Sequence, residues 1–203
     1  MLVAGGELAE ALEMRFIREV SDGTIAPVPY ANYLLIEEAF VRTATRLHGL
    51  AVWDAPSWTA VEANARAVHA LVGEQTAYFR AARAEWPAAA DMSEKQLAQS
   101  ERLSEFALEA AREGGYAAVM TTLFAAETLY HTWCSAAHEK GNVPPGPIAD
   151  WVELHAAEPF HAGVRALAAA VDALPADIPD ARVHAWFTGM LAAETAFHDA
   201  VFG

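Results

Sequence analysis

Cysteine and positive charge are the scarcest features of this 203-residue sequence. Cys134 is the single cysteine, so no disulfide can form within the chain. Lysine and arginine number 13 against 27 aspartates and glutamates, which gives a formal net charge of −14 at pH 7. Because a surface of this sign repels phosphate backbones, we expect no nucleic-acid partner.

Long apolar runs are absent as well. No segment approaches the roughly 18 consecutive apolar residues that cross a bilayer, so we expect no association with membranes. The opening residues, MLVAGGELAEALEMRF, are interrupted by glycines and acids and do not resemble a secretory signal. The expected location is therefore the cytoplasm.

Strand patterns and the common catalytic signatures are missing too. Alternating apolar and polar residues between turn pairs, which are typical of β-strands, do not occur. The sequence also has no Gly-x-Ser-x-Gly, no phosphate-binding glycine loop and no Cys-x-x-Cys. What remains is a chain with 54% hydrophobic and 20% charged residues, which is typical of a globular protein with a sizeable core.

Helical periodicity runs through the whole chain and predicts an all-α bundle of about seven helices. We expect one domain, residues 1–203, because no low-complexity linker interrupts the pattern. Ser93 and Gln96 have the spacing of a capping box, and the loop GNVPPGP at 141–147 is the strongest break. The expected helices cover residues 2–20, 27–50, 60–86, 93–114, 116–140, 148–174 and 179–202.

Three glutamates, Glu37, Glu127 and Glu194, lie on the apolar faces of three different predicted helices. A buried carboxylate must be paired, hydrogen-bonded or protonated, so three of them indicate an internal pocket. The pattern leaves open that they lie at helix borders and reach water. At about 100° per residue their apolar neighbours are Tyr30, Tyr33, Phe40 and Val41 for the first, Met120, Leu123, Phe124, Tyr130 and Cys134 for the second, and Val183, Phe187, Met190, Phe197 and Val201 for the third.

A metal site is one reading of the acids and histidines, because carboxylate and imidazole ligands from several bundle helices form di-iron sites. Two observations oppose it. Ligands at i, i+3 and i+6 spread over about 120° of a helix, and two of the histidines lie about 40° from their glutamates, towards polar strips such as the one formed by Thr121, Thr128, Thr132 and Ser135. We therefore expect neither a metal nor another cofactor. The spacings in question are Glu127–His131, Glu194–His198, Glu62–His69 and His155-x-x-Glu158-x-x-His161.

Two further features bear on chemistry. Cys134 lies two turns after Glu127 on the same face and could reach a pocket, but a lone cysteine in an alanine-rich helix is more typical of a small buried residue. Tyr33, Phe40, Tyr130 and Phe197 each lie one turn from a glutamate, so they are the candidates to enclose a planar ring. A carboxylate beside such an aromatic slot suits an aminopyrimidine-like ligand.

Pro159 interrupts the helix expected at 148–174. Its missing amide removes the hydrogen bond to the carbonyl of His155 and predicts a bend there.

Four segments, in this order, resemble the TenA family, which comprises thiaminase II and its relatives. The resemblance spans residues 14–202, and it implies a haem-oxygenase-like fold and a homodimer or homotetramer. The segments are residues 21–25 with 33–41 (SDGTI and YLLIEEAFV), 125–130 (AAETLY), 151–164 (a helix with a Trp…Tyr…Phe pattern in the family) and 194–198 (ETAFH).

The resemblance also implies roles for single residues. Glu37 stands where an acidic residue of the family binds the pyrimidine amine, and Glu194 where the acid/base glutamate of a Glu-x-x-Phe-Trp motif lies. His155 occupies the place of a tyrosine, and His198 that of the tryptophan.

One departure concerns the nucleophile. Thiaminase II has a cysteine four residues before the motif tyrosine, and here that position is Ala126. The sequence is similar instead to the branch with a glutamate in this motif, here Glu127. That branch acts in thiamine salvage by hydrolysing aminopyrimidines and deformylating their N-formyl precursors.

The resulting hypothesis is an aminopyrimidine hydrolase whose small-molecule partner is the aminopyrimidine. Two alternatives remain: a di-iron oxidase on the same fold, and a pyrimidine-binding or regulatory protein without catalysis. The expected site comprises catalytic Glu194 and Glu127 and substrate-binding Glu37, Tyr33, Phe40, Tyr130, His155 and Phe197.

Overall fold

All regular structure is helical in the computed structural model, which describes residues 5–203. Nine α-helices and one π-helical turn occupy that range, and no strand occurs within it. None of these helices has an apolar stretch sufficient to span a bilayer. The elements are α1 (Gly5–Leu12), α2 (Arg15–Ser21), α3 (Pro27–Trp53), α4 (Trp58–Ala70), the π-turn η1 (Leu71–Gln75), α5 (Thr76–Glu85), α6 (Glu94–Lys140), α7 (Pro147–Ala156), α8 (Glu158–Asp172) and α9 (Asp180–Asp199).

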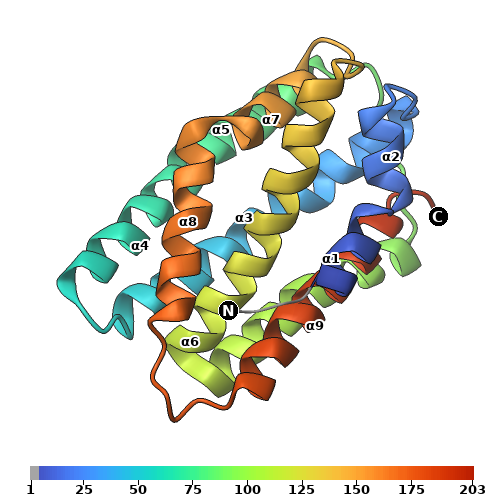
Figure 1. Cartoon of the computed structure of the whole chain (residues 1–203). Coiled ribbons are helices and arrows are strands. Elements are labelled where there is room, and N and C mark those ends of the chain that lie inside the picture. Colours follow the sequence, from blue (N-terminus) through green and yellow to red (C-terminus); the bar gives the residue numbers. More distant parts are fainter. Residues whose placement is uncertain (1–4) are drawn as a thin grey trace.

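Helix α6 is the centre of the bundle. It packs against α3, α7, α8 and α9 and also contacts α1 and α2. Its first half runs alongside α9, and its second half passes between α8 and α2 (Figure 1). Side chains from all these helices form one contiguous apolar core, and Phe16, Trp133 and Leu129 are among its fully buried members. Burial of a side chain of this size typically stabilises a fold by about 1.5–3 kcal/mol.

Local sequence sets most of the helix ends. The predicted capping box at the start of α6 is confirmed: Ser93 Oγ accepts from the Gln96 amide at 3.3 Å, and Gln96 Oε1 accepts from the Ser93 amide at 2.9 Å. The same helix ends at Gly141, whose left-handed φ of 69° suits a residue without a Cβ. Pro27 and Pro147 begin α3 and α7, where the missing proline amide removes no helical hydrogen bond.

The predicted helix 148–174 is divided in two at Ala157, which has extended dihedral angles of −75° and 152°. Pro159 lies in the first turn of α8, where a proline is tolerated, and the predicted bend is confirmed. The carbonyl of His155, which the proline cannot satisfy, is 3.3 Å from Nδ1 of His131 on α6. The contact between His131 and this carbonyl therefore connects the α7–α8 corner to the central helix α6.

Two other predicted helices also differ from the observed ones. The helix expected at 2–20 is divided into α1 and α2 near Met14, and its residues 2–4 lie outside the described range. The helix expected at 60–86 begins at Trp58, ends at Glu85 and contains the π-turn η1. The predicted helices 93–114 and 116–140 form one bent helix, α6. This joining and the three divisions explain why nine α-helices occur where about seven were predicted.

Gly115 produces the sharp bend between the two halves of α6. Its dihedral angles, φ 54° and ψ −139°, lie outside the helical region and are accessible to glycine but not to residues with a Cβ. This bend allows the first half to pair with α9 while the second half crosses the core (Figure 1).

We expect Gly115→Ala to destabilise the protein by about 1–3 kcal/mol, because alanine would be held at a strained φ. Thermal unfolding should report a decrease of several degrees. Gly49→Ala on α3 is the control: its added Cβ meets no atom within 4 Å, and the helix gains propensity, so its melting temperature should stay equal or rise. Equal melting temperatures for the two variants would contradict the strain argument.

Candidate active site

Tyr130 joins three helices through its hydroxyl group. That oxygen lies 3.0 Å from Glu37 Oε2 and 3.2 Å from the Tyr33 hydroxyl, both on α3. It also lies 3.2 Å from Nε2 of His198 on α9. All four side chains are buried, and Glu37 is only 8% exposed. The contacts form a polar cluster inside the apolar core.

His198 continues this cluster to Glu194. Its Nδ1 donates to the backbone carbonyl of Glu194 at 2.8 Å and is 3.6 Å from the carboxyl oxygen Oε2 of the same residue. That Oε2 atom is buried and has no hydrogen-bond partner among residues 5–203. A continuous path of contacts therefore leads from Glu37 through Tyr130 and His198 to Glu194.

Proton counting fixes the direction of the hydrogen bonds in this path. Burial lowers the pKa of His198 to about 4, so the ring is neutral at pH 7. Because Nδ1 donates to a carbonyl, Nε2 carries no proton and must accept from the Tyr130 hydroxyl. Burial raises the pKa of Glu37 to about 8, so its carboxyl is mostly protonated at pH 7 and can donate to the Tyr130 oxygen. Every donor in the path then has an acceptor.

Glu194 is the most strongly perturbed carboxyl. Burial raises its pKa well above the usual range, and the charges of Glu37 and Glu127 raise it further. At 1% exposure it has almost no contact with water. Although His198 and Glu194 lie within ion-pair distance, both are neutral at pH 7, so their contact is not a salt bridge.

Glu127 lies on α6, one turn before Tyr130. It is half-buried, and burial raises its pKa to about 7. It makes no hydrogen bond or ion pair with any residue between 5 and 203, but its charge raises the pKa of both Glu37 and Glu194. The three carboxyls are therefore close enough to interact electrostatically, and Tyr130 and His198 also connect the Glu37 carboxyl to the backbone carbonyl of Glu194.

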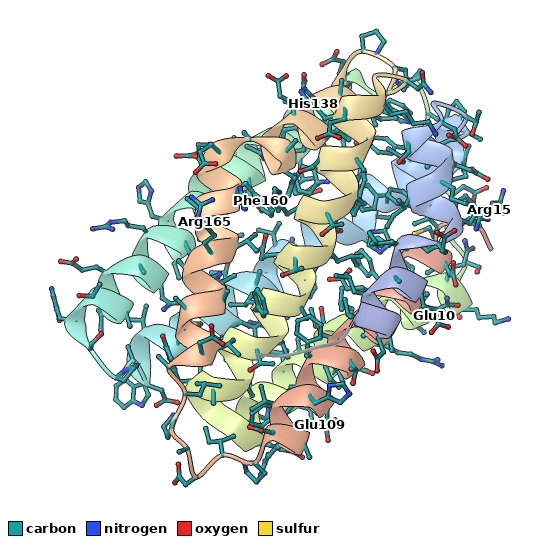
Figure 2. All side chains as sticks on the ribbon, viewed as in Figure 1. Glu10, Arg15, Glu109, His138, Phe160 and Arg165 are labelled. Atoms are coloured by element: carbon teal, nitrogen blue, oxygen red, sulfur yellow. The ribbon has the colours of Figure 1, made fainter. Side chains whose placement is uncertain are left out.

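A cavity of about 1090 Å³ lies between α4, α6 and α8, and Glu127 lies in its wall. Glu37 and Glu194 do not line it and remain enclosed in the packed interior. Phe160, which also lines the cavity, lies between α8 and α6, whereas Arg165 lies on the outer face of α8 (Figure 2).

The structure places the predicted aromatic residues in different settings. Tyr33 is fully buried, with its ring stacked on His198 at 5.7 Å and against Phe16 at 4.6 Å, so it has no free face for a ligand. Phe197 is also buried, and its ring centroid is 6.1 Å from that of Phe40, which is half-buried.

His155 lies beside the cluster, with its ring centroid 5.4 Å from that of Tyr130. Its Nδ1 donates to the Trp151 carbonyl at 2.7 Å, and burial lowers its pKa to about 4. The neutral ring therefore has Nε2 as an acceptor.

Two residues that the sequence analysis placed on or towards polar strips, one on α6 and one on α9, are buried, whereas Thr128, Thr132 and Ser135 of the α6 strip are partly exposed. His198 and Thr121 are both 0% exposed. The Thr121 hydroxyl donates a hydrogen bond to the Ala117 carbonyl of its own helix at 2.8 Å, so it needs no water as a partner. The physical reason is that α6 is surrounded by other helices, so polarity on one side of it does not mark a solvent face.

The proposed metal ligands do not converge in this structure. No group of three His, Cys, Asp or Glu side chains between residues 5 and 203 has an arrangement that could hold a metal ion. Glu62 lies on the exposed side of α4, where it contacts Arg66 at 3.5 Å and accepts from the Trp58 indole at 3.1 Å. These residues therefore do not fit a di-iron site.

Sequence reasoning missed three polar atoms near the cluster. The indole N–H groups of Trp133 and Trp151 and the hydroxyl of Tyr30 are buried without a partner among the described residues. The two indole rings lie 5.9 and 6.3 Å from the Tyr130 ring. Unpaired buried donors are rare and fit a site that receives a polar ligand. The sequence spacing could have identified one of them, because Trp133 follows Tyr130 by three residues and therefore lies on the same helix face.

No family model matches this sequence, and no curated protein matches it. Solved structures do match. A TenA homologue from P. horikoshii OT3 superposes with a TM-score of 0.84 at 15% identity, over 98% of this chain and 94% of the other. A Silicibacter protein named as a TenA family transcription regulator gives 0.83 at 18% identity, over 98% and 93%. A Sulfolobus solfataricus protein described as a TenA-like thiaminase gives 0.71 at 13% identity, over 99% and 96%.

These likenesses establish the fold. The predicted all-α, haem-oxygenase-like architecture is confirmed, and it is the architecture of TenA homologues over nearly the whole length of both chains.

Proposed function

We propose that this chain is a hydrolase of the TenA type that cleaves the C–N bond of an aminomethyl pyrimidine, such as 4-amino-5-aminomethyl-2-methylpyrimidine. The observation that carries the proposal is the group of three carboxyls, Glu37, Glu127 and Glu194, whose pKa values burial raises. The likeness to a protein described as a TenA-like thiaminase supports the reaction class.

Glu194 is suited to the role of general acid. Burial raises the pKa of its carboxyl well above the usual range, which favours the protonated acid, and its Oε2 has no partner within the described chain, so that oxygen has an unused hydrogen-bonding position for a substrate nitrogen. As the C–N bond breaks, Glu194 gives its proton to the departing amine, which leaves as ammonia.

Glu127 is suited to the role of general base. Its pKa of about 7 leaves a large ionised fraction at neutral pH, in contrast to Glu194. The carboxylate takes a proton from water while the hydroxide oxygen bonds to the methylene carbon. The products are a hydroxymethyl pyrimidine and ammonia, and the net transfer of one proton from Glu127 to Glu194 restores both groups.

Glu37, which is hydrogen-bonded to Tyr130, is suited to bind the pyrimidine ring of the substrate. A carboxyl can pair with a ring nitrogen and the exocyclic amine together. The aromatic residues around it, Tyr130, Phe40 and Phe197, together with His155 Nε2, supply apolar surface and one further acceptor.

The direct test is ammonia release by the purified protein from a panel of aminopyrimidines, with the N-formyl derivatives assayed for formate. We expect ammonia from at least one aminomethyl pyrimidine. Binding of the hydroxymethyl product without any turnover would instead indicate a binding or regulatory protein, the class named for the Silicibacter relative. Activity that depends on near-stoichiometric iron or manganese would also contradict the proposal.

Cys134→Ala should leave ammonia release within about twofold of the wild type. The thiol is fully buried, and burial raises its pKa well above the usual range, so it is not an available nucleophile. Initial rates at saturating substrate measure this directly. Loss of activity in a variant with wild-type thermal stability would show that the cysteine takes part in the chemistry.

A further inference from the structure

The cavity beside Glu127 has walls of small side chains. Ala63 and Ala67 face it from α4, Ala166 and Ala170 from α8, and Met120 forms part of the floor on α6. Short side chains on two facing helices leave the space between them unfilled, which explains a volume of about 1090 Å³ in a protein of this size.

The charges in the wall are all of one sign. Asp54 and Glu127 line the cavity, and no lysine or arginine is among its lining residues in the described chain. His48, the remaining basic group, has its pKa lowered by burial and is therefore neutral at pH 7. Its Nδ1 lies 2.8 Å from Asn64 Oδ1 and must donate to it, which leaves Nε2 as an acceptor.

Glu127 is one of the two acids in the cavity wall and lies on the central helix α6. Its carboxyl has no hydrogen-bond or ion-pair partner within residues 5–203, although it is half-buried. A carboxylate in such a position is stabilised by a ligand that brings hydrogen-bond donors and positive charge. Anionic ligands such as phosphates and carboxylates would meet Asp54 and Glu127 with no compensating cation.

The size of the cavity indicates how large the body of the ligand is. Pockets for drug-sized ligands typically measure about 300–1,000 Å³, and this one exceeds that range, whereas a single-ring aminopyrimidine would fill a small part of it. The walls between α4 and α8 offer mostly alanine and other apolar surface.

We propose that this cavity binds an amine with an extended apolar body, with the nitrogen at Glu127 and the body between α4 and α8. Binding here requires no hydrolysis, so the inference goes beyond the proposed function, although Glu127 belongs to both.

The test is a titration with the series from n-butylamine to n-octylamine by isothermal titration calorimetry. Each added methylene should tighten binding about fourfold while it is being buried, because a buried methylene contributes about 0.8 kcal/mol. The matched n-alcohols and n-carboxylates should bind at least tenfold more weakly. An affinity that does not depend on chain length, or that is equal for alcohols and amines, would overturn the proposal.

A matched pair of variants on one helix locates the site. Ala63 and Ala65 are both exposed on α4, but only Ala63 lines the cavity. Ala63→Phe should therefore weaken n-octylamine binding at least tenfold, whereas Ala65→Phe should leave it within about twofold. Glu127→Gln should remove the preference for amines over alcohols and keep the dependence on chain length.

The remaining outcomes separate this inference from its competitors. Equal effects of the two phenylalanine variants on n-octylamine binding would overturn it. A change of oligomeric state caused by Ala63→Phe alone would also overturn it, since the occupant of the cavity would then be a second copy of the chain. Ammonia release from aminopyrimidines without alkylamine binding would overturn this inference and support the proposed function. Alkylamine binding without ammonia release from any aminopyrimidine would support this inference and contradict the proposed function.

Discussion

Replacing Glu194 by glutamine is expected to lower the turnover of aminopyrimidine hydrolysis by about a hundred- to ten-thousand-fold. Glutamine has the same shape, but its amide cannot give a proton to the departing amine. The carboxyl that it replaces is 1% exposed, and burial raises its pKa well above the usual range, so it holds that proton at pH 7. Steady-state ammonia release gives kcat and KM separately, and the loss should fall on kcat.

Two controls accompany this variant. Its melting temperature should stay close to that of the wild type, because a neutral glutamine replaces a neutral carboxyl in the same contacts. Glu37→Ala should behave differently and mainly raise KM, since Glu37 is proposed to hold the ring. If Glu194→Gln retains near-normal kcat, Glu194 is not the acid.

The second large effect is on stability and does not depend on the reaction. The pKa of Glu37 is about 8 in the folded protein, against 4.5 for the model carboxyl, because the folded state buries it. The folded protein therefore binds this proton more tightly than the unfolded chain. The corresponding stabilisation is fully present below about pH 4.5 and is lost as the pH rises through about 8.

Glu37→Gln should remove this pH dependence, because glutamine stays neutral and its amide can still hydrogen-bond to the Tyr130 hydroxyl. Near pH 5 the variant and the wild type should have similar stability. At pH 9 the variant should be more stable by roughly 4–5 kcal/mol, or on the order of 10 °C in melting temperature. Urea unfolding at pH 5, 7 and 9 measures the difference.

Glu38→Gln is the matched control for this prediction. Glu38 is the next residue on α3 and pairs with Arg83 at 2.6 Å in a partly exposed ion pair. Such a pair contributes at most about 1 kcal/mol, so the control variant should show no comparable gain at pH 9. A Glu37→Gln curve parallel to that of the wild type would mean that Glu37 is ionised in the folded protein.

Several features of the fold follow from short stretches of sequence. The capping box at Ser93, the glycine end at Gly141 and the bend near Pro159 were predictable because each depends on a few neighbouring residues. The burial of Glu37 and Glu194 was also predictable, since a helical period of 3.6 places them among large apolar side chains.

The same periodicity was misleading for the central helices. A polar strip predicts a solvent face only if one side of the helix is free, and α6 is covered by α3, α7, α8 and α9. Thr121 was therefore placed towards water although it is fully buried, and the same reasoning misplaced His198 on α9. Which helices cover which faces is decided by packing between segments far apart in the chain.

The sequence by itself determined the helical class, most helix ends and the apolar setting of the three glutamates, because these depend on local geometry and side-chain period. Only the tertiary structure decided that Tyr130 joins Glu37 to His198, since these partners are 93 and 68 residues away along the chain. It also decided that Glu127 lies in the cavity wall while Glu37 and Glu194 stay enclosed. The reason is that the angle at Gly115 and the spacing of α4 and α8 set which side of α6 is covered and which is left open.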